Sequence, residues 1–474
     1  MKTQEKNVSR RDFLKSSSAS LAALGTLGLT ASLPSLAANP PKTRLAIVGT
    51  GARGIGMWGS PVARDYPDYI EMVGLCDINR KRVEVARRLI GSNITDMDGM
   101  MRIEKPEGGK ATRRATGEGI PTFTDFDEMV RTVKPDRVIV TTMDSIHARY
   151  VIRAMELGCD VICEKPFATD AEQCQAIIDA RKKCQRNITV TFNARYGSSA
   201  VKVKELLKAG EIGELYSVDY AEYLDLDHGA SYFRRWHGLK ECSGTLLVHK
   251  ASHHFDELNW WIDSDPVEVT AYGDLKKFGR KGPFRHINCR LCVHKNKCPY
   301  YWDITKNEHL MNLYVNCESE DGYFRDGCLY RNAINIYDTM SAQVKYANKV
   351  LVTYSLNAGV PCEGQIIVFN GSKGRIELRN FSRQPWEAPH NAEIRLMRNF
   401  KKDSTFLPIA PRRGSHGGSD KLIKDHVFIP GTPDELGQRA GMRAGIMSAI
   451  IGIAGYHSIE TGRRMRIDEL VDFG

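Results

Sequence analysis

The stretch Gly49-Thr50-Gly51-Ala52-Arg53-Gly54 constrains the fold more than any other part of the sequence. It follows directly on a short apolar run, Arg44 to Val48, and precedes a segment of helical length. Glycines spaced G-x-G-x-x-G between a strand and a helix let the backbone turn tightly and approach a pyrophosphate, and the helix N-terminus offers unpaired N–H groups. The sequence therefore predicts a dinucleotide-binding unit close to residue 42.

A second apolar run, Glu71 to Cys76, ends at Asp77, about 20 residues after the glycines. A carboxylate at this place accepts hydrogen bonds from a ribose 2′-hydroxyl and would repel a 2′-phosphate. Asp77 thus favours NAD over NADP, although Arg80 and Arg82 weaken the preference.

Two further apolar runs, Asp136 to Thr142 and Asp160 to Cys163, flank a helical stretch from Ala148 to Leu157. Alternating strands and helices of this length predict an α/β fold with a parallel, doubly wound sheet. The second run leads into Glu164-Lys165-Pro166, and Lys165 is expected to point into the crevice where such sheets bind ligands. Residues 93–119 are polar and rich in glycine, and we expect a long surface loop there.

These residues together resemble the glucose–fructose oxidoreductase and inositol dehydrogenase (Gfo/Idh/MocA) family. The resemblance covers most of the chain and implies a dehydrogenase in which Lys165 reaches both the nicotinamide ribose and a substrate hydroxyl. The cofactor-binding positions that it implies are Gly49, Thr50, Gly51, Ala52, Arg53, Gly54, Asp77, Thr142, Met143, His147, Glu164, Lys165 and Asn193.

The segment from Ser243 to Trp261 gathers His249, Lys250, His253 and His254 within six residues. Residues four apart share a helical face, so we expect His249 and His253 to lie together. The family pattern D-x-G-x-H-x-x-D aligns His253 with the catalytic histidine and His249 with the usual aspartate. Imidazole suits a general base because its pKa of ~6.5 lies near neutrality. The identity of the general base stays open: it is either His253 or the pair of His249 and Lys250.

Substrate contacts are predicted from two stretches. The family's strand end that meets cofactor and substrate matches Asn193, Arg195 and Tyr196. Arg235 and Trp236 offer a guanidinium group for vicinal hydroxyls and an indole face for a sugar ring. The predicted substrate-binding residues are Arg195, Tyr196, Arg235, Trp236 and His254.

Five of the 12 cysteines lie between Cys289 and Cys328, in a charged and aromatic insertion at about residues 280–332. The spacing C-x2-C suits a knuckle that presents two thiolates to one metal ion. We predict a structural zinc site whose ligands are Cys289, Cys292, Cys298 and Cys317. Disulfides, an iron–sulfur cluster and free thiols stay open as alternatives.

The N-terminus reads Ser9-Arg10-Arg11-Asp12-Phe13-Leu14-Lys15 and continues into a short uncharged run that ends near Ala37. We predict a twin-arginine signal peptide over residues 1–37, export of the folded protein to the periplasm, and no membrane span after cleavage. The predicted domains are a Rossmann domain at 42–167 and an α+β domain at 168–474. Period-two alternation after residue 338 predicts an open, mostly antiparallel sheet in the second domain.

The net charge of +10 is modest for 474 residues, and no basic run carries interleaved aromatics, which argues against nucleic acid as a partner. The leading hypothesis is NAD-dependent oxidation of a sugar or glycoside hydroxyl, such as that on C3. The cofactor would stay tightly bound and be re-oxidised by a second sugar or an electron acceptor. The alternatives are a redox-neutral, NAD-dependent glycoside hydrolase with a transient 3-keto intermediate, and a non-catalytic sugar-binding protein. Whether the protein forms a homo-oligomer also stays open.

Overall fold

The computed structural model describes residues 41–97, 100–103, 117–388, 392–410 and 412–474. The predicted signal peptide and most of the predicted loop at 93–119 lie outside these residues. Within the described part of that loop, β3 (Ile94–Met97) and β4 (Met100–Ile103) form a two-stranded antiparallel hairpin.

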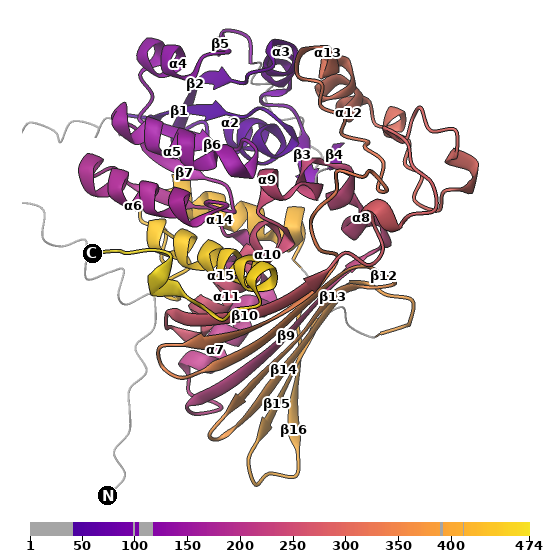
Figure 1. Ribbon diagram of the computed structural model, residues 1–474. Helices are drawn as coiled ribbons and strands as arrows, with labels where there is room; N and C mark the ends of the chain where they lie inside the picture. The colour runs from indigo at the N-terminus through magenta and orange to yellow at the C-terminus, as the bar shows by residue number, and fades with distance from the viewer. Residues whose placement is uncertain (1–40, 98–99, 104–116, 389–391, 411) are drawn as a thin grey trace, which may run out of the picture. The chain divides into compact units, whose positions relative to one another are not determined.

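Six parallel strands make the first sheet, as predicted from the alternation of strands and helices (Figure 1). Their order is β5 (Thr122–Phe123), β2 (Ile70–Cys76), β1 (Thr43–Val48), β6 (Arg137–Val140), β7 (Asp160–Cys163) and β8 (Ile188–Val190). Because β8 pairs with β7, the sheet continues beyond the predicted boundary at residue 167.

Helices alternate with these strands, and polar side chains begin several of them. The helices are α2 (Ser60–Asp65), α3 (Arg80–Leu89), α4 (Phe126–Val133), α5 (His147–Glu156) and α6 (Ala171–Cys184). The carboxylate of Asp125 accepts the N–H of Glu128 at 2.7 Å, and Asp170 accepts that of Gln173 at 2.8 Å. Such caps satisfy N–H groups that have no partner inside the helix.

Nine strands make the second sheet, which is mixed and mostly antiparallel. Their order is β16 (Ser404–Pro408), β15 (Ala392–Arg398), β14 (Gly374–Arg383), β13 (Glu363–Gly371), β9 (Leu215–Asp225), β12 (Leu351–Val360), β11 (Thr339–Tyr346), β10 (Pro266–Asp274) and β17 (Met465–Arg466). Among these nine described strands, only β9 and β12 pair in parallel. Along β11 exposed and buried residues alternate strictly, as in a sheet with one solvated face.

The helices between residues 198 and 461 pack on the second sheet or between the two sheets. They are α7 (Ser198–Lys208), α8 (Leu226–Arg234), α9 (Lys240–Ser243), α10 (Leu246–His249), α11 (Ala251–Ile262), α14 (Ser419–Phe428) and α15 (Met442–Thr461). The histidine segment is helical as expected: α10 and α11 meet at Lys250, whose backbone keeps helical angles (φ −84°, ψ −48°). Two short helices, α12 (Glu308–Leu313) and α13 (Glu318–Asp321), belong to the predicted insertion.

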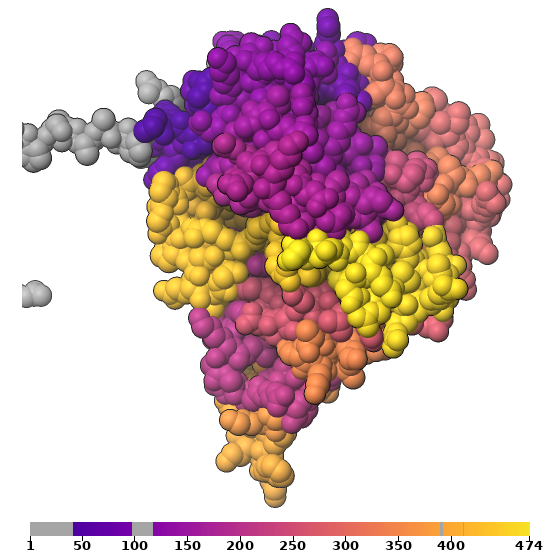
Figure 2. Space-filling view, turned by 60° about the vertical axis from the view of Figure 1, so that its left-hand side comes forward, coloured from indigo at the N-terminus to yellow at the C-terminus, as the bar shows by residue number. Residues whose placement is uncertain are grey.

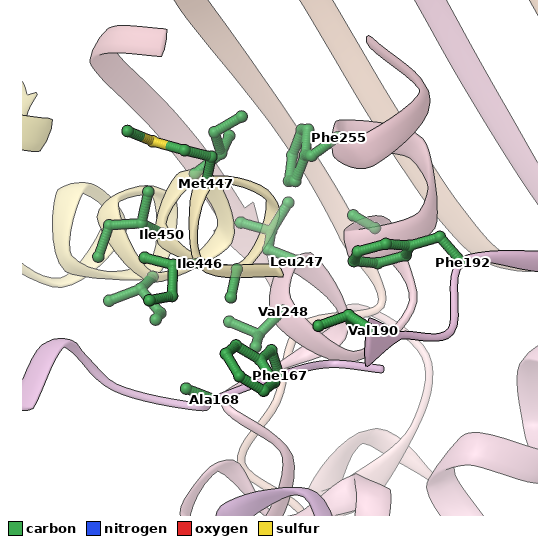
Figure 3. Close-up of a cluster of buried hydrophobic side chains, with 14 of the residues drawn as sticks. Phe167, Ala168, Val190, Phe192, Leu247, Val248, Phe255, Ile446, Met447 and Ile450 are labelled. Carbon is green, nitrogen blue, oxygen red and sulfur yellow. The ribbon is translucent and has the colours of Figure 1, made fainter. Parts of the chain in front are cut away.

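A shared apolar core joins the two sheets through α10, α11 and α15. Figure 3 shows Phe167, which follows β7, and Val190, on the edge strand β8, in one apolar cluster with Leu247 of α10 and Ile446 of α15. A Cβ atom on Gly452 would lie 2.2 Å from the carbonyl oxygen of Leu247, so this glycine permits the close approach of α15. Figure 2 shows α15 and the residues after it, in yellow, lying against residues near α6, in purple.

Within the described residues, no helix combines the length and apolar character needed to cross a bilayer.

Candidate functional site

A cavity of about 770 Å³ lies at the carboxyl ends of the first sheet's strands, facing α10 and α11. Its lining includes most of the predicted cofactor residues: Gly49, Gly51, Ala52, Arg53, Asp77, Thr142, Met143, His147, Glu164, Lys165 and Asn193. Thr50 and Gly54 are buried behind this lining. The predicted catalytic residues His249, Lys250 and His253 line the same cavity, so one space joins both sets.

The glycine loop leaves room that side chains would fill. Gly49 has φ +88°, and a Cβ atom there would lie 2.7 Å from the backbone of Thr141 and Thr142. A Cβ atom on Gly54 would lie 2.2 Å from the carbonyl oxygen of Gly49. The hydroxyl of Thr141 donates to that same oxygen at 2.6 Å and holds the turn.

Asp77 is fixed at the end of β2 by the residues around it. The N–H and the hydroxyl of Thr50 donate to its carboxylate at 2.8 and 3.0 Å, and the N–H of Asn79 donates at 3.0 Å. The side chain is buried yet lines the cavity. A glycine cradle followed by a buried carboxylate fits the pyrophosphate and ribose of a dinucleotide.

The insertion reaches this part of the cavity, which the sequence analysis did not predict. The hydroxyl of Tyr314 accepts the N–H of Ala52, in the glycine loop, at 2.8 Å. Asp321 accepts hydrogen bonds from Arg82 at 2.6 Å and from Asn79 at 2.9 Å. Tyr314 and Asp321 both line the cavity. The insertion therefore forms one wall of the predicted cofactor site.

Glu164 ties the predicted motif after β7 to the glycine loop. Its carboxylate accepts hydrogen bonds from Arg53 and from the indole N–H of Trp58, both at 2.8 Å. The two ring nitrogens of His147 lie 2.8 Å from the Pro166 carbonyl oxygen and 3.1 Å from that of Thr142. These contacts fix the loops that present Lys165 to the cavity.

Lys165 lies next to the histidine segment. Its Nζ donates to the carbonyl oxygen of His249 at 2.9 Å. Burial lowers the pKa of Lys165 to about 8, although Asp144 and Glu164 oppose the shift. The ammonium group is therefore able to lose its proton in the mildly alkaline range.

His249 is paired with Asp144, a residue that sequence reasoning did not assign to the site. The Nδ1 atom of His249 lies 2.5 Å from the Asp144 carboxylate, and both residues line the cavity. Burial raises the pKa of Asp144 well above its usual range, whereas Lys165 and Arg235 oppose the rise. Burial also lowers the pKa of His249. The His249 side chain thus has the carboxylate partner that the family pattern would place at residue 249 itself.

His253 lies on α11 and lines the same cavity without such a partner. Its Nδ1 atom is buried and has no hydrogen-bond partner among the described residues. Burial lowers its pKa, and the nearby charges of Lys165 and Lys250 lower it further. His253 is thus a neutral imidazole whose ring no carboxylate orients.

A buried group of ionisable side chains lies behind the histidines. The Nδ1 atom of His254 lies 2.8 Å from the Tyr354 hydroxyl. Lys250 Nζ lies 3.4 Å from the Glu222 carboxylate. Burial raises the pKa of Glu222 to about 7 and that of Glu257 to about 8. Lys250, His254 and Glu257 line the cavity, so these groups belong to the site.

The predicted substrate residues separate into two sets. Arg235 and Trp236 line the cavity, with the Trp236 ring stacked on His237 at 3.6 Å between centroids. Arg195 instead forms a buried, two-pronged ion pair with Asp256, with both hydrogen bonds at 2.6 Å. Tyr196 is buried as well, and neither Arg195 nor Tyr196 lines the cavity. Asn193 lines it and donates to Asp420 at 2.7 Å.

The predicted zinc site is not supported. Among the described residues, no group of three or more His, Cys, Asp or Glu side chains is arranged to hold a metal ion. The predicted ligand set also needs correction, because Cys317 lies beside Arg82 and Asp321 and not beside the other three cysteines. Cys289, Cys292 and Cys298 instead line a small cavity together with Cys328. Linear spacing alone did not distinguish Cys317 from Cys328.

Comparisons with known proteins agree with this geometry. The chain is 33% identical over 454 residues to YteT of Bacillus subtilis, named as an oxidoreductase, covering 90% of this chain and 98% of YteT. It is 32% identical over 205 residues to an inositol 2-dehydrogenase of Gluconacetobacter diazotrophicus, or 42% of this chain and 56% of that enzyme.

Solved structures share the fold at low identity. The Bordetella pertussis WlbA dehydrogenase, in complex with NADH and UDP-GlcNAcA, matches with a TM-score of 0.57 at 18% identity, covering 90% of this chain and 99% of WlbA. The aldose–aldose oxidoreductase of Caulobacter crescentus matches with a TM-score of 0.56 at 15% identity, covering 90% of this chain and all of that enzyme.

Two family profiles match the chain directly. Residues 43–192 match the NAD-binding Rossmann fold of an oxidoreductase family, and residues 204–467 match the C-terminal alpha/beta domain of the same family. The chain therefore belongs to the Gfo/Idh/MocA family of NAD-binding oxidoreductases, which is related to the inositol dehydrogenases.

Proposed function

We propose that this protein oxidises a hydroxyl group of a sugar or other polyol with NAD as a tightly held cofactor. The observation that carries the proposal is the meeting of Lys165 with the His249–Asp144 pair. Nζ of Lys165 lies 2.9 Å from the backbone of His249, and the imidazole lies 2.5 Å from the carboxylate. A cation and a carboxylate-oriented imidazole beside a dinucleotide cradle are the groups that alcohol oxidation requires.

Lys165, His249 and Asp144 have different roles at the substrate hydroxyl. Lys165 donates a hydrogen bond to the hydroxyl oxygen and stabilises negative charge as it develops there. When Asp144 is ionised, its carboxylate accepts the Nδ1 proton of His249, which leaves the lone pair on Nε2 to take the hydroxyl proton. Bound NAD⁺ supplies the chemistry of accepting the hydride from the carbinol carbon. The O–H bond breaks, a C=O bond forms, and the proton rests on the imidazole.

His249 is preferred as the base over His253 because of its partner. A carboxylate on Nδ1 holds the ring in one tautomer and stabilises the imidazolium ion that proton transfer creates. His253 has no such partner, and Lys165 and Lys250 disfavour its protonation. His253 is therefore proposed to bind a neighbouring substrate hydroxyl.

A polyhydroxylated ring fits the remaining wall of the cavity. Arg235 and Trp236 contribute a guanidinium group and an indole face, while Gln365 and Asn380 contribute amides from β13 and β14. Aromatic faces and paired hydrogen-bond donors suit sugar rings. The inositol dehydrogenase relatives and the sugar nucleotide named with WlbA support the same substrate class.

Tight cofactor binding is proposed from the wall that the insertion forms. Tyr314 contacts the glycine loop and Asp321 contacts two residues beside Asp77. Lys81, on α3, donates to Ser319 at 2.8 Å and adds a further link to the insertion. A dinucleotide held under this wall would have to displace these contacts in order to leave.

Export by the twin-arginine route and a periplasmic location are part of the proposal. They depend on the Arg10-Arg11 pair, which lies outside the described residues. A cofactor that stays bound would explain how a nicotinamide-dependent enzyme works where free NAD is scarce.

The proposal is tested by mixing purified protein, with its bound NAD, with a panel of hexoses, inositols and glycosides. Reduction of the bound nicotinamide is followed by absorbance, and the keto product by mass spectrometry. We expect at least one polyol to reduce the cofactor, and Lys165→Ala to lower the rate more than about 10-fold, or ~1.4 kcal/mol in barrier. Sugar binding without any cofactor reduction would instead indicate a non-catalytic sugar-binding protein.

A further inference from the structure

Two guanidinium groups from distant parts of the chain line the proposed active site. Arg235 follows α8, and Arg325 lies in the insertion after α13, yet both belong to the wall of the large cavity. Arg325 is buried, and its guanidinium group lies 4.3 Å from the centre of the Tyr314 ring. The insertion therefore adds a second cation to the wall that carries Arg235.

Arg235 is held in place by contacts that include no ion pair. Its Nε and Nη2 atoms donate to the backbone oxygen and the hydroxyl of Ser231 at 3.0 and 3.1 Å. Its guanidinium group also lies 5.1 Å from the centre of the Tyr232 ring. Among the described residues, no carboxylate forms an ion pair with Arg235. These contacts fix the guanidinium group and leave further N–H groups for a ligand.

Three other cationic side chains of the cavity wall each have a carboxylate within ion-pair distance. They are Arg53 with Glu164, Arg82 with Asp321, and Lys250 with Glu222. A cation that leaves water without such a partner carries a desolvation cost, which an anionic ligand would offset.

Like charges act on each other at Arg235. Burial lowers the pKa of Arg235, and the charge of Arg325 lowers it further, whereas nearby tyrosines and Asp96 oppose the shift. Asp96 also lies 4.0 Å from Arg53, so several cations share this carboxylate. Repulsion between two guanidinium groups away from bulk water is relieved when an anion binds beside both.

His237 adds a neutral imidazole to the same wall. Its Nδ1 atom is buried and has no hydrogen-bond partner among the described residues. Its ring packs on those of Trp236 and His249, at 3.6 and 4.2 Å between centroids. Burial lowers its pKa, and the charges of Arg235 and Lys165 lower it further. A buried nitrogen without a partner is a place where a ligand hydroxyl gains a hydrogen bond.

The neighbours of Arg235 indicate which molecule carries the anion. The charge of Arg235 acts on both Asp144 and His249, the proposed catalytic pair. The pyrophosphate of a dinucleotide instead binds at the N–H groups of the glycine loop. An anion beside Arg235 would therefore lie on the substrate and not on the cofactor.

We propose that the substrate is an acidic sugar whose anionic group, a carboxylate or a phosphate, binds to Arg235 and Arg325. Both groups present anionic oxygens that guanidinium binds through paired hydrogen bonds. Trp236 packs against the sugar ring, and His237 binds one of its hydroxyls. The inference rests on the proposed oxidation of a sugar hydroxyl and names the class of sugar.

The test compares sugars that differ only at C6, using the whole protein with its bound NAD. Glucose is compared with glucuronate and glucose 6-phosphate, and galactose with galacturonate and galactose 6-phosphate. The rate of cofactor reduction is measured against sugar concentration. We expect an acidic sugar to half-saturate the protein at a concentration about 10-fold lower than its neutral partner does. The uronates and the phosphates distinguish the two anions. Acidic sugars that saturate no better than the neutral ones would overturn the proposal.

Variants show whether the two arginines cause the preference. Arg235→Gln and Arg325→Gln should each raise the half-saturating concentration of the acidic sugar about 10-fold and change that of the neutral sugar little. Arg235→Lys should recover part of the loss, because it keeps the charge. Arg285→Gln is the matched control: this arginine of the insertion is exposed and lies outside the cavity lining, so both values should stay the same. Equal losses for acidic and neutral sugars would overturn the assignment.

Calorimetry on the same NAD-loaded protein separates this inference from the proposed function. Glucuronate or glucose 6-phosphate should bind more tightly than glucose, and the difference should vanish in Arg235→Gln. Binding of the acids without cofactor reduction would support the anion site and contradict the proposed oxidation. Cofactor reduction by neutral sugars alone, or no binding of either acid, would contradict the anion site. Loss of bound NAD from Arg235→Gln would assign the anion to the cofactor and overturn the inference.

Discussion

At the scale of single residues, Asp144 has the clearest expected effect on the chemistry. Its carboxylate orients His249, so Asp144→Asn keeps the shape but removes the charge that stabilises the imidazolium ion. We expect the rate of cofactor reduction to fall about 100-fold, or ~2.7 kcal/mol in barrier, with little change in substrate affinity. Stopped-flow absorbance of the bound nicotinamide measures the rate.

A control separates this effect from a change in stability. Asp65→Asn alters a carboxylate that is paired with Arg64, outside the lining of the cavity, and should leave the rate unchanged. If Asp144→Asn keeps more than about a third of the rate while His253→Ala loses it, the base is His253 and our assignment is wrong.

The pH dependence of the same reaction reports on Lys165. Because its pKa is lowered to about 8, the ammonium form is present below that pH and disappears as the pH rises through it. We expect the rate to fall above pH about 8. In Lys165→Arg the residual rate should not fall above pH about 8, because the guanidinium group stays protonated there.

The acidic limb of the pH–rate profile reports on the His249–Asp144 pair. Burial raises the pKa of Asp144. As the pH falls, the pair therefore takes up a proton, and stops acting as a base, at a higher pH than an exposed carboxylate would. Asp144→Asn should move this lower limb to more acidic pH. A lower limb that stays in place would show that another group sets it.

Some site residues could be read from the sequence and others could not, for a physical reason. Gly49, Asp77 and Lys165 lie in short patterns whose chemistry depends on near neighbours along the chain. The partnership of Asp144 with His249 joins residues 105 positions apart, and that of Ala52 with Tyr314 joins residues 262 positions apart. Such contacts are set by the packing of the two sheets, which local spacing does not report.

At the scale of elements, the insertion is expected to control how long the cofactor stays bound. Tyr314→Phe removes the hydroxyl at the glycine loop, and Asp321→Asn removes a carboxylate bonded by Arg82 and Asn79. We expect the double variant to release NAD about 10-fold faster, the effect of one or two hydrogen bonds. Release is measured on the reduced cofactor, by the decay of NADH fluorescence after dilution into excess competing nucleotide.

Tyr301 supplies the matched control for that measurement. It lies in the same insertion but is 37% exposed and does not line the cofactor cavity. Tyr301→Phe should keep the original release rate. Equal rates in all variants would mean that the insertion does not retain the cofactor.

The elements themselves were predicted to differing degrees. The strands β1, β2, β6 and β7 were predicted because each is a continuous apolar run, as buried strands require, whereas β5, of two residues, is too short to give such a run. The histidine segment was expected to be helical because its apolar residues recur at helical spacing, and α10 and α11 meet at Lys250 with helical backbone angles.

At the scale of the whole molecule, the N-terminus is predicted to decide where the protein works. Replacing Arg10 and Arg11 together by Lys should leave unprocessed, folded precursor in the cytoplasm, because the export receptor reads the arginine pair. Fractionation and immunoblotting locate the protein, and mass spectrometry measures its NAD content. Export that continues normally in the double variant would show that another signal is used.

The net reaction is decided by whether the cofactor can be regenerated within one catalytic cycle. An oxidoreductase with trapped NAD stops after its first turnover, since the reduced nicotinamide has no outlet. A redox-neutral glycoside hydrolase uses the transient ketone to acidify the neighbouring C–H bond, eliminates the aglycone, and then returns the hydride. Glu257 lines the cavity, and because its pKa is raised to about 8 it is mostly a neutral carboxylic acid at pH 7 that could protonate a leaving group.

A nitrophenyl glycoside separates the two reactions when no electron acceptor is present. We expect the bound nicotinamide to be reduced once per chain, with nitrophenol release no greater than one equivalent. Adding a keto sugar or an artificial acceptor should then restore many turnovers of glycoside oxidation. His249→Ala should slow the first reduction, because proton removal accompanies hydride loss from the same carbinol. Continuous acceptor-free release of nitrophenol, with solvent deuterium entering next to the transient ketone, would instead establish the hydrolase.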